Sequence, residues 1–494
     1  MRSNSISDHD GDTRGRFLGD VAIRFLGQAV NALKGLIFLP LIARSFGESS
    51  YGIWTQISLT VVLLQPLLTL RLESALVRYL AGASAGIERR RALSSVNFVT
   101  WTSGMIVLFL AWALKEGLSL ILFGSRSLAE FAVPLGLLLV AQATLSVSVA
   151  AFRAMGRLKR CTVIQVASSL GSIIVVAIAV QVFGASLHQA VIAWAISTGV
   201  ASLVARGLLT RGSGAWSVRV HRGTARRFLR YSLPLIPTVA AAWIIEYSDR
   251  YFLVHLLGLG DAGVYTGAYR LAQIMRMLMT PLVFVLLPTI LRLRQRGKSS
   301  LAQSLTRDAH SAYLLVACGI APLLIVWGPQ VLVSLASESF RVSQSLLALV
   351  VIGELFLSLR TLYTQLLFLS ERTLAVMLVV GGTAMMNIAA NLLLIPVLGL
   401  LGAALATAFS YATQWLIMRS LVQDRDTLSV PFPLLARALA GGGLVYVLLS
   451  MTESLGTGGA ILGIACAALV YFGVIGSSKT ARSLLRRMFA TPSH

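Results

Sequence analysis

Residues 230–294 read RYSLPLIPTVAAAWIIEYSDRYFLVHLLGLGDAGVYTGAYRLAQIMRMLMTPLVFVLLPTILRLR. The stretch contains two apolar segments, each long enough to cross the ~30 Å hydrocarbon core of a bilayer as a helix. Both carry charges well inside: Glu246, Asp249 and Arg250 in the first segment, Arg270 and Arg276 in the second. Charged side chains at membrane depth are costly unless they face a partner or a water-filled cavity. The stretch therefore predicts a helical membrane protein with a partly polar interior.

The composition extends this prediction to the whole chain. Of the 494 residues, 56% are hydrophobic and only 12% are charged, whereas a soluble domain carries about 25% charged residues. The apolar runs are too long for membrane strands and do not alternate with period two, so an all-α polytopic membrane protein is expected. Membrane helices, about fourteen in number, are predicted at 20–44, 51–72, 92–114, 129–152, 161–183, 188–210, 231–256, 263–291, 309–335, 343–369, 373–395, 399–421, 434–451 and 458–476.

Basic residues are concentrated in alternate loops between these helices. The net charge of +23 would suggest a nucleic-acid partner in a soluble protein. Here the basic clusters, for example at 89–91, 157–160 and 292–298, alternate with short loops that are nearly uncharged. By the positive-inside rule, the basic loops and both termini are expected in the cytoplasm, and no nucleic-acid partner is expected.

Motifs for catalysis and cofactors are missing from the sequence. The three cysteines lie far apart in or beside apolar runs, so no metal or disulfide framework is expected. No GxxxxGK[ST] sequence for ATP hydrolysis occurs. The sequence GASAG at 82–86 fits GxSxG but lies in a polar loop instead of between a strand and a helix. The longest of the nearly uncharged loops, 115–128, contains three charged residues, Lys115, Glu116 and Arg126, of which only Glu116 is an acid. These features argue against an enzyme.

A short internal repeat predicts how the helices are grouped. GESSYGIWT at 47–55 and GLGDAGVYT at 258–266 share the pattern G-x4-G followed by β-branched, aromatic and Thr residues. Six predicted helices separate the copies, so the halves have the same orientation and form a parallel repeat. The prediction is two six-helix lobes around a central cavity. Its parts are a tail at 1–19, the lobes at 20–210 and 231–421, a basic linker at 211–230, an appended helix pair within 422–476 and a basic tail at 477–494.

Polar residues recur at helical spacing within the first and eighth predicted helices. The first stripe consists of Arg24, Gln28, Asn31 and Lys34, and the second of Thr266, Arg270, Gln273 and Arg276. Such stripes are often the interior face of a bundle, with polar atoms bonded between helices. Four cations in the two lobes exceed the nearby acids, which favours cavity-lining residues that bind an anionic substrate. Arg24 and Arg276 could instead lie near the inner membrane–water interface and extend their charged groups towards the water.

The remaining embedded charges have two interpretations. Glu246, Asp249 and Arg250 form either a structural ion pair, with Arg270 as a further partner, or a gate or ion-coupling site. In the tenth predicted helix, Glu354 could carry a proton if burial raises its affinity for one, or it could pair with a basic residue. Arg360 lies on another face of the same helix and is assigned to the same gate or coupling group.

The ordered motifs of residues 17–421 resemble a known family. They are PLIARSFG at 40–47, RYSLPLIP at 230–237, SDRYF at 248–252, GVYTGAY at 263–269 and GLLGAALAT at 399–407. Together they resemble the bacterial polysaccharide-biosynthesis flippases for O-antigen or exopolysaccharide repeat units. That family belongs to the multidrug/oligosaccharidyl-lipid/polysaccharide exporter superfamily. The resemblance implies two lobes around an alternating-access cavity in the bacterial inner membrane.

The resemblance also implies a substrate and partners. The expected substrate is an undecaprenyl-diphosphate-linked oligosaccharide repeat unit, moved from the inner to the outer leaflet for surface polysaccharide assembly. Membrane lipids and a polysaccharide polymerase or export machinery are the implied partners. A peptidoglycan-precursor flippase and a drug or cation antiporter of the same superfamily remain as alternatives. The antiporter would need acidic cavity walls, which the excess of embedded arginine disfavours.

Overall fold

The structure is a computed structural model that describes residues 5–80, 87–210, 220–422, 431–452 and 456–477. Side chains are described within these ranges except for 5–29, 31–32, 210, 284–285 and 456–462. The sequence GASAG at 82–86, the first part of the linker at 211–219 and the tail at 478–494 lie outside the described residues. Contacts divide the chain into two compact units, Met1–Gly263 and Val264–His494.

The described part of the chain is helical throughout and contains no strand, which confirms the predicted fold class. Twelve of its helices are long and apolar enough to cross a membrane, and a shorter apolar helix covers Gly463–Gly476. One of the twelve spans, Leu33–Leu68, contains an interruption at Gly47. The predicted number of fourteen is therefore approximate.

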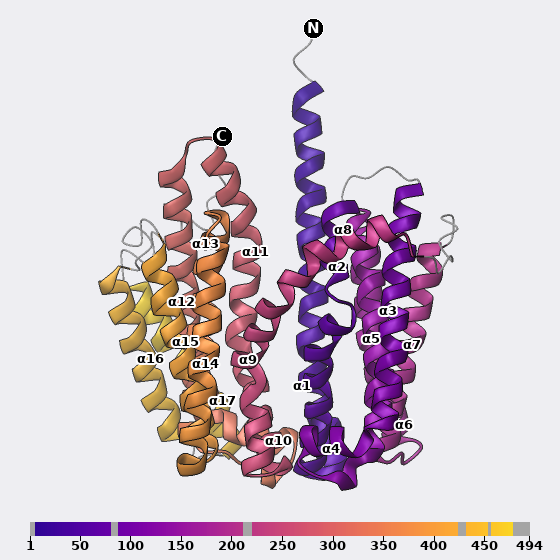
Figure 1. The fold of residues 1–494 in the computed structure, drawn as a ribbon. Coiled ribbons are helices and arrows are strands. Elements are labelled where there is room, and N and C mark those ends of the chain that lie inside the picture. The colour runs from indigo at the N-terminus through magenta and orange to yellow at the C-terminus, as the bar shows by residue number, and fades with distance from the viewer. Residues whose placement is uncertain (1–4, 81–86, 211–219, 423–430, 453–455, 478–494) are drawn as a thin grey trace. The chain divides into compact units, whose positions relative to one another are not determined.

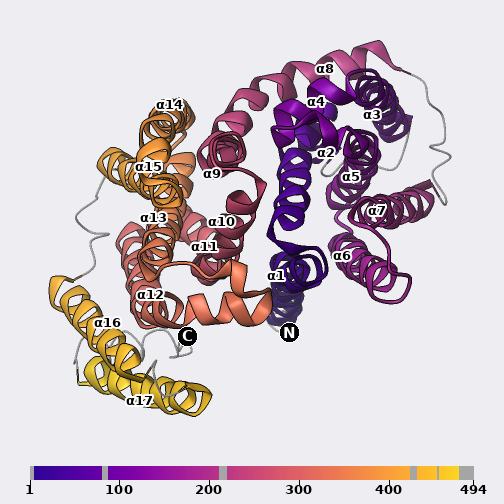
Figure 2. The same ribbon diagram turned by 90° about the horizontal axis from the view of Figure 1, so that it is seen from below.

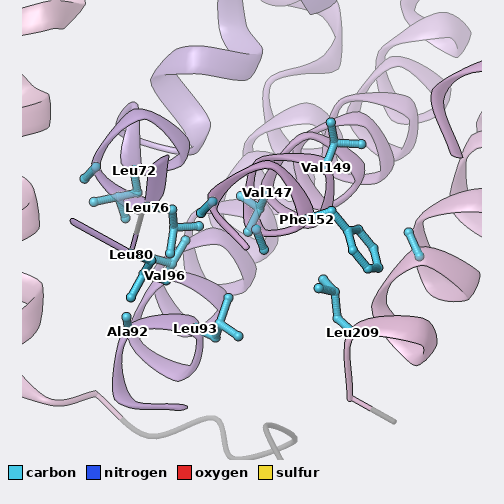
Figure 3. Close-up of a cluster of buried hydrophobic side chains, with 14 of the residues drawn as sticks. Leu72, Leu76, Leu80, Ala92, Leu93, Val96, Val147, Val149, Phe152 and Leu209 are labelled. Atoms are coloured by element: carbon cyan, nitrogen blue, oxygen red, sulfur yellow. The ribbon is translucent and has the colours of Figure 1, made fainter. Parts of the chain in front are cut away.

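The N-terminal unit is a bundle built around α5 (Figures 1 and 2). Its elements are α1 (Ser5–Leu68), α2 (Leu72–Leu80), α3 (Ile87–Ala113), α4 (Lys115–Phe123), η1 (Arg126–Phe131), α5 (Ala132–Ala154), α6 (Leu158–Gln181), α7 (Leu187–Thr210), α8 (Arg222–Ser232), η2 (Leu233–Leu235) and α9 (Ile236–Leu256). Helix α5 contacts α1, α2, α3, α6 and α7. An apolar cluster that includes Leu76, Val96, Phe152 and Leu209 fills the space between these helices (Figure 3).

Helix α1 combines the first two predicted membrane segments. Gly47 has φ 83° and ψ 179°, a backbone conformation that only glycine adopts at little cost, so the helices before and after it are distinct. The interruption falls within the loop predicted at 45–50. The helix begins at Ser5 and not near residue 20, so it includes most of the stretch that was expected to be a tail.

Glycines bring the two copies of the internal repeat into backbone contact within the N-terminal unit. A Cβ atom added to Gly52 would lie 2.0 Å from the carbonyl oxygen of Leu259. A Cβ atom added to Gly263 would lie 2.4 Å from the carbonyl oxygen of Glu48. The contact is reciprocal, because Glu48 and Leu259 occupy equivalent positions in the two copies. Only glycine permits this approach of the two backbones.

Part of the predicted basic linker is the amphipathic helix α8, which sequence analysis missed. Phe228 is buried, whereas Arg222, Arg226, Arg227 and Arg230 are exposed. The guanidinium of Arg227 lies 4.3 Å from the ring centroid of Tyr79 on α2. These contacts attach α8 to the end of the unit at which α5 ends and α6 begins, called the basic end below.

The C-terminal unit contains the rest of the chain. Its elements are the end of α10 (Leu259–Ala272), then α11 (Ile274–Gln295), α12 (Ser299–Leu335), η3 (Glu338–Phe340), α13 (Gln344–Leu369), α14 (Thr373–Leu398), α15 (Leu400–Leu421), α16 (Phe432–Thr452) and α17 (Gly456–Gly476). Helix α13 contacts α11, α12, α14 and α15, and α16 contacts α12 and α17. The helix predicted at 263–291 is divided at Gln273 into α10 and α11.

Candidate functional site

The N-terminal unit contains a polar cavity of about 480 Å³ between α1, α2, α5 and α6. Most of its wall is polar or charged, although the surrounding helices are apolar. The lining residues are Lys34, Gln65, Arg71, Glu73, Ser74, Val77, Gln142, Leu145, Ser146, Val149, Ala150, Arg153, Gln165, Ser168 and Ser169. A water-accessible space of this kind is where embedded charges are tolerated in a membrane protein.

Helical periodicity places polar side chains of α5 and α6 on the faces of these helices that line the cavity. On α5, Gln142, Ser146 and Arg153 are separated by four and seven residues, which places them on one side of the helix. Gln165 and Ser168 do the same on α6. Since a helix rises about 1.5 Å per residue, the lining of α5 extends over ~16 Å from Arg153 to Gln142. The cavity therefore reaches from the basic end deep into the unit.

Lys34 contributes a positive charge from α1. Its ammonium lies 5.0 Å from the ring centroid of Trp194 and 5.6 Å from that of Phe38. Trp194 is itself stacked on Trp54 at 4.7 Å. Aromatic faces attract a cation but do not neutralise it, and no described carboxylate forms an ion pair with Lys34. The ammonium is therefore available to an anion in the cavity.

A strained turn positions the second cation. Leu70 and Arg71, between α1 and α2, have φ values of 48° and 56°, which are uncommon for residues other than glycine. The turn brings Arg71 Nη1 to 3.4 Å from Glu73 Oε1. Glu73 Oε2 is buried without a hydrogen-bond partner among the described residues. Backbone strain of this kind is often found at functional sites.

The charges of the cavity do not balance. Three cations, Lys34, Arg71 and Arg153, line it together with one carboxylate, Glu73. The lining thus has an excess of two positive charges (three minus one) in a space enclosed largely by apolar helices. Electrostatic attraction is stronger there than in bulk water, so the arrangement suits an anion with several negative oxygens.

The other predicted binding residues have different environments. The side chains of Arg24, Gln28 and Asn31 lie outside the described residues. Arg270 Nη1 donates to Gln273 Oε1 at 3.4 Å, and no described carboxylate pairs with this arginine. Thr266 is buried on α10.

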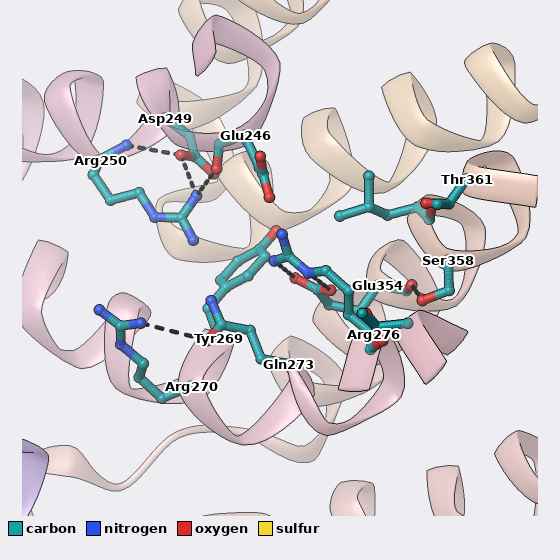
Figure 4. A network of polar contacts seen from close by, with 12 residues as sticks. Glu246, Asp249, Arg250, Tyr269, Arg270, Gln273, Arg276, Glu354, Ser358 and Thr361 are labelled. Atoms are coloured by element: carbon teal, nitrogen blue, oxygen red, sulfur yellow. Dashed lines mark hydrogen bonds and ion pairs between the residues drawn. The ribbon is translucent and has the colours of Figure 1, made fainter. Parts of the chain in front are cut away.

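Arg276 and Glu354 form an ion pair in the C-terminal unit (Figure 4). Arg276 Nη2 donates to Glu354 Oε1 at 2.9 Å, and Nε donates to Oε2 at 3.2 Å. The Glu354 side chain is only 1% exposed, whereas that of Arg276 is 30% exposed. Ser358 Oγ donates to the backbone carbonyl of Glu354 at 2.7 Å. Of the two interpretations of Glu354, this geometry corresponds to pairing with a basic residue.

Asp249 and Arg250 form a second buried pair, in the N-terminal unit (Figure 4). Arg250 Nη1 donates to Asp249 Oδ1 at 2.6 Å and to the backbone carbonyl of Glu246 at 2.8 Å. The arrangement is that of a structural ion pair. A gating or coupling role for this group, and for half-buried Arg360 on α13, stays a prediction.

Several cavity residues were missed by sequence analysis. Arg71 is the second-last residue of the second predicted helix, Glu73 follows that helix directly, and Arg153 was assigned to a loop. Gln142 with Ser146, and Gln165 with Ser168, did stand at helical spacing in predicted membrane segments. That spacing was the available signal.

Comparisons with known proteins agree with this architecture. A profile of the family described as polysaccharide biosynthesis protein matches residues 17–294. No curated protein matches the chain in sequence. Among solved structures, the lipid II flippase MurJ in an inward closed conformation has a TM-score of 0.75 at 15% identity, covering 95% of this chain and 100% of that one.

Two transporters of the MOP superfamily share the fold. An inward-facing multidrug resistance MATE family transporter has a TM-score of 0.65 at 14% identity, covering 86% of this chain and 96% of that one. A transporter from Pyrococcus furiosus, described as having a binding pocket of reverse polarity, has a TM-score of 0.55 at 14% identity, covering 87% and 95% of the two chains. The fold is therefore shared with a flippase and with transporters. With its family profile matched over more than half of its length, the chain belongs to the polysaccharide biosynthesis protein family.

Proposed function

We propose that the protein is a flippase that moves a lipid-linked oligosaccharide, carried on an undecaprenyl diphosphate, from the inner to the outer leaflet of the bacterial inner membrane. The excess of cations in the cavity of the N-terminal unit carries this proposal. A diphosphate offers several anionic oxygens for charge-assisted hydrogen bonds with arginine and lysine. Family membership supports a role in surface polysaccharide assembly, such as that of O-antigen or exopolysaccharide.

The location of the charges suggests an order of events. In the proposed orientation the basic end, with α8, faces the cytoplasm. Exposed arginines there attract anionic headgroups to the inner leaflet. The diphosphate then enters between Arg71 and Arg153, and the sugars occupy the water-filled space while the lipid tail stays in the bilayer. Alternating access would release the substrate at the other face.

The same chemistry would serve a peptidoglycan precursor, which is also a lipid diphosphate. Complementation separates the two substrates: rescue of a strain lacking its lipid II flippase would favour the precursor, and rescue of an O-antigen or exopolysaccharide flippase mutant would favour the proposal. A cation antiporter is disfavoured because three of the four charged residues lining the cavity are positive.

Neutralising the cavity cations tests the proposal. We expect Lys34→Gln and Arg71→Gln each to reduce surface polysaccharide export about tenfold or more, because a lost charge-assisted hydrogen bond costs about 1.5–3 kcal/mol. Export is measured by surface labelling of polysaccharide in a deletion strain, normalised to the amount of flippase in the membrane.

Lys159→Gln is the matched control for these variants. Lys159 is an exposed base near the basic end on α6 that does not line the cavity. Its replacement should leave export nearly unchanged. Normal export by both cavity variants, at normal protein levels, would remove the cavity from the transport route.

A further inference from the structure

One wall of the cavity is neutral but rich in hydrogen-bonding groups. It is formed by Gln142 on α5 together with Gln165 and Ser168 on α6, named the amide wall here. The Gln142 amide and the Ser168 hydroxyl make no hydrogen bond among the described residues. Within the ranges that the structure describes, Gln165 accepts only a long contact of 3.8 Å, from the Cys161 thiol to its Oε1 atom.

A neighbouring glutamine shows that bonding within the protein is possible at this cavity. Gln65 Nε2 donates to Ser146 Oγ at 2.8 Å, and Ser146 Oγ in turn donates to the backbone carbonyl of Ala143 at 2.9 Å. The amide wall has no equivalent bond to another residue in the part of the chain that the structure describes. In a water-accessible cavity such groups bind water, and a ligand that displaces this water must replace its hydrogen bonds. The amide wall therefore suits a ligand that both donates and accepts hydrogen bonds.

Sugars have this chemistry. Hydroxyl and N-acetyl groups each act as donor or acceptor, and a glutamine amide provides both functions in one plane. Binding pockets for small molecules commonly fix orientation through a few such groups. Resting on the proposed function, we infer that the amide wall binds the sugar next to the diphosphate and that this sugar is uncharged.

The charge of the cavity explains why the sugar is uncharged. The excess of two positive charges matches a diphosphate diester, which carries one negative charge on each phosphate. No further cation of this lining is left for a uronic or sialic acid, and the buried Oε2 atom of Glu73 would repel a second carboxylate. The amide wall itself contributes no charge.

Three charge-defined probes test the inference with the purified full-length protein. One is an isoprenyl methyl diphosphate, which has the diphosphate diester without a sugar. The other two replace the methyl group with N-acetylglucosamine or with glucuronic acid. For the unaltered protein, we expect N-acetylglucosamine to improve the dissociation constant about tenfold over methyl, the factor that corresponds to 1.4 kcal/mol. Glucuronic acid should bind more weakly than N-acetylglucosamine.

Amide-wall variants complete the experiment. Gln142→Leu and Gln165→Leu should each remove most of the gain from the neutral sugar while leaving affinity for the methyl probe unchanged, which also shows that the variants are folded. Gln181→Leu, on the exposed part of α6, should bind all probes like the unaltered protein.

The outcomes separate this inference from the proposed function. No binding of the methyl probe to the unaltered protein would overturn the proposed function, and the inference with it. Binding of the methyl probe with no gain from N-acetylglucosamine, or tighter binding of glucuronic acid, would overturn the inference alone. Equal losses for methyl and sugar probes in the glutamine variants would also overturn it.

Discussion

Replacing Arg276 by alanine is expected to destabilise the protein by about 3–5 kcal/mol, because it leaves a buried carboxylate without its cationic partner. Glu354 is 1% exposed and receives two hydrogen bonds from Arg276, at 2.9 and 3.2 Å. The midpoint of thermal unfolding in detergent would measure the loss. The double variant Arg276→Ala, Glu354→Gln should recover part of it, since a neutral amide costs less to bury than an unpaired charge.

Arg270→Ala is the matched comparison for this prediction. Arg270 bonds Gln273 at 3.4 Å and forms no ion pair with a described carboxylate, so its loss leaves no buried charge unpaired. A clearly smaller decrease in the unfolding midpoint is expected. Equal decreases for Arg270→Ala and Arg276→Ala would show that the pair with Glu354 is not the cause.

Gly263→Ala is expected to have the second large effect, a loss of about 3 kcal/mol or more. Overpacking usually costs about 1–3 kcal/mol, but the atoms in the way here are backbone. The new methyl group would lie 2.4 Å from the carbonyl oxygen of Glu48 and 3.0 Å from the amide nitrogen of Gly52. Neither can move without displacing its helix. The yield of folded protein in the membrane and its unfolding midpoint are the measurements.

Gly207→Ala controls for the general effect of a methyl group on a helical glycine. A Cβ atom at Gly207 on α7 would meet no atom within 4 Å, and alanine favours a helix by up to about 1 kcal/mol over glycine. This variant should be as stable as the parent protein or more stable. If Gly263→Ala were equally well folded, the close contact between the repeat copies would not be needed for stability.

The sequence allowed the helical architecture to be predicted, since apolar length alone identifies membrane helices. Local interruptions of the helices were harder to predict from the sequence. Gly47 stood in a predicted loop, and its positive φ supplies the break. The division at Gln273 has no sequence signal, because this residue keeps helical angles (φ −56°, ψ −17°) and its neighbours continue the helical pattern. Helix α8 was missed because its sequence is too basic for a membrane helix.

The candidate site was less predictable than the fold. Lys34 was singled out because a lysine inside an apolar segment needs a polar environment. Arg71 and Glu73 depend on a turn with two positive φ values at residues other than glycine, which no sequence rule anticipates. The pairing of Arg276 with Glu354 joins residues that are 78 positions apart, and spacing along one helix says nothing about such a partner. The lobe boundaries at 20–210 and 231–421 stay predictions.

Thiol labelling shows whether the N-terminal unit holds a water-filled cavity with a positive potential. A cysteine would replace Ser168 in a protein whose own cysteines, Cys161, Cys318 and Cys466, are changed to alanine. An anionic and a cationic thiol reagent of equal size are compared, each relative to its rate with a free thiol. Faster reaction with the anionic reagent is expected, by about threefold or more, and this preference should be lost in Arg71→Gln. A preference for the cationic reagent, or no reaction with either, would contradict this expectation.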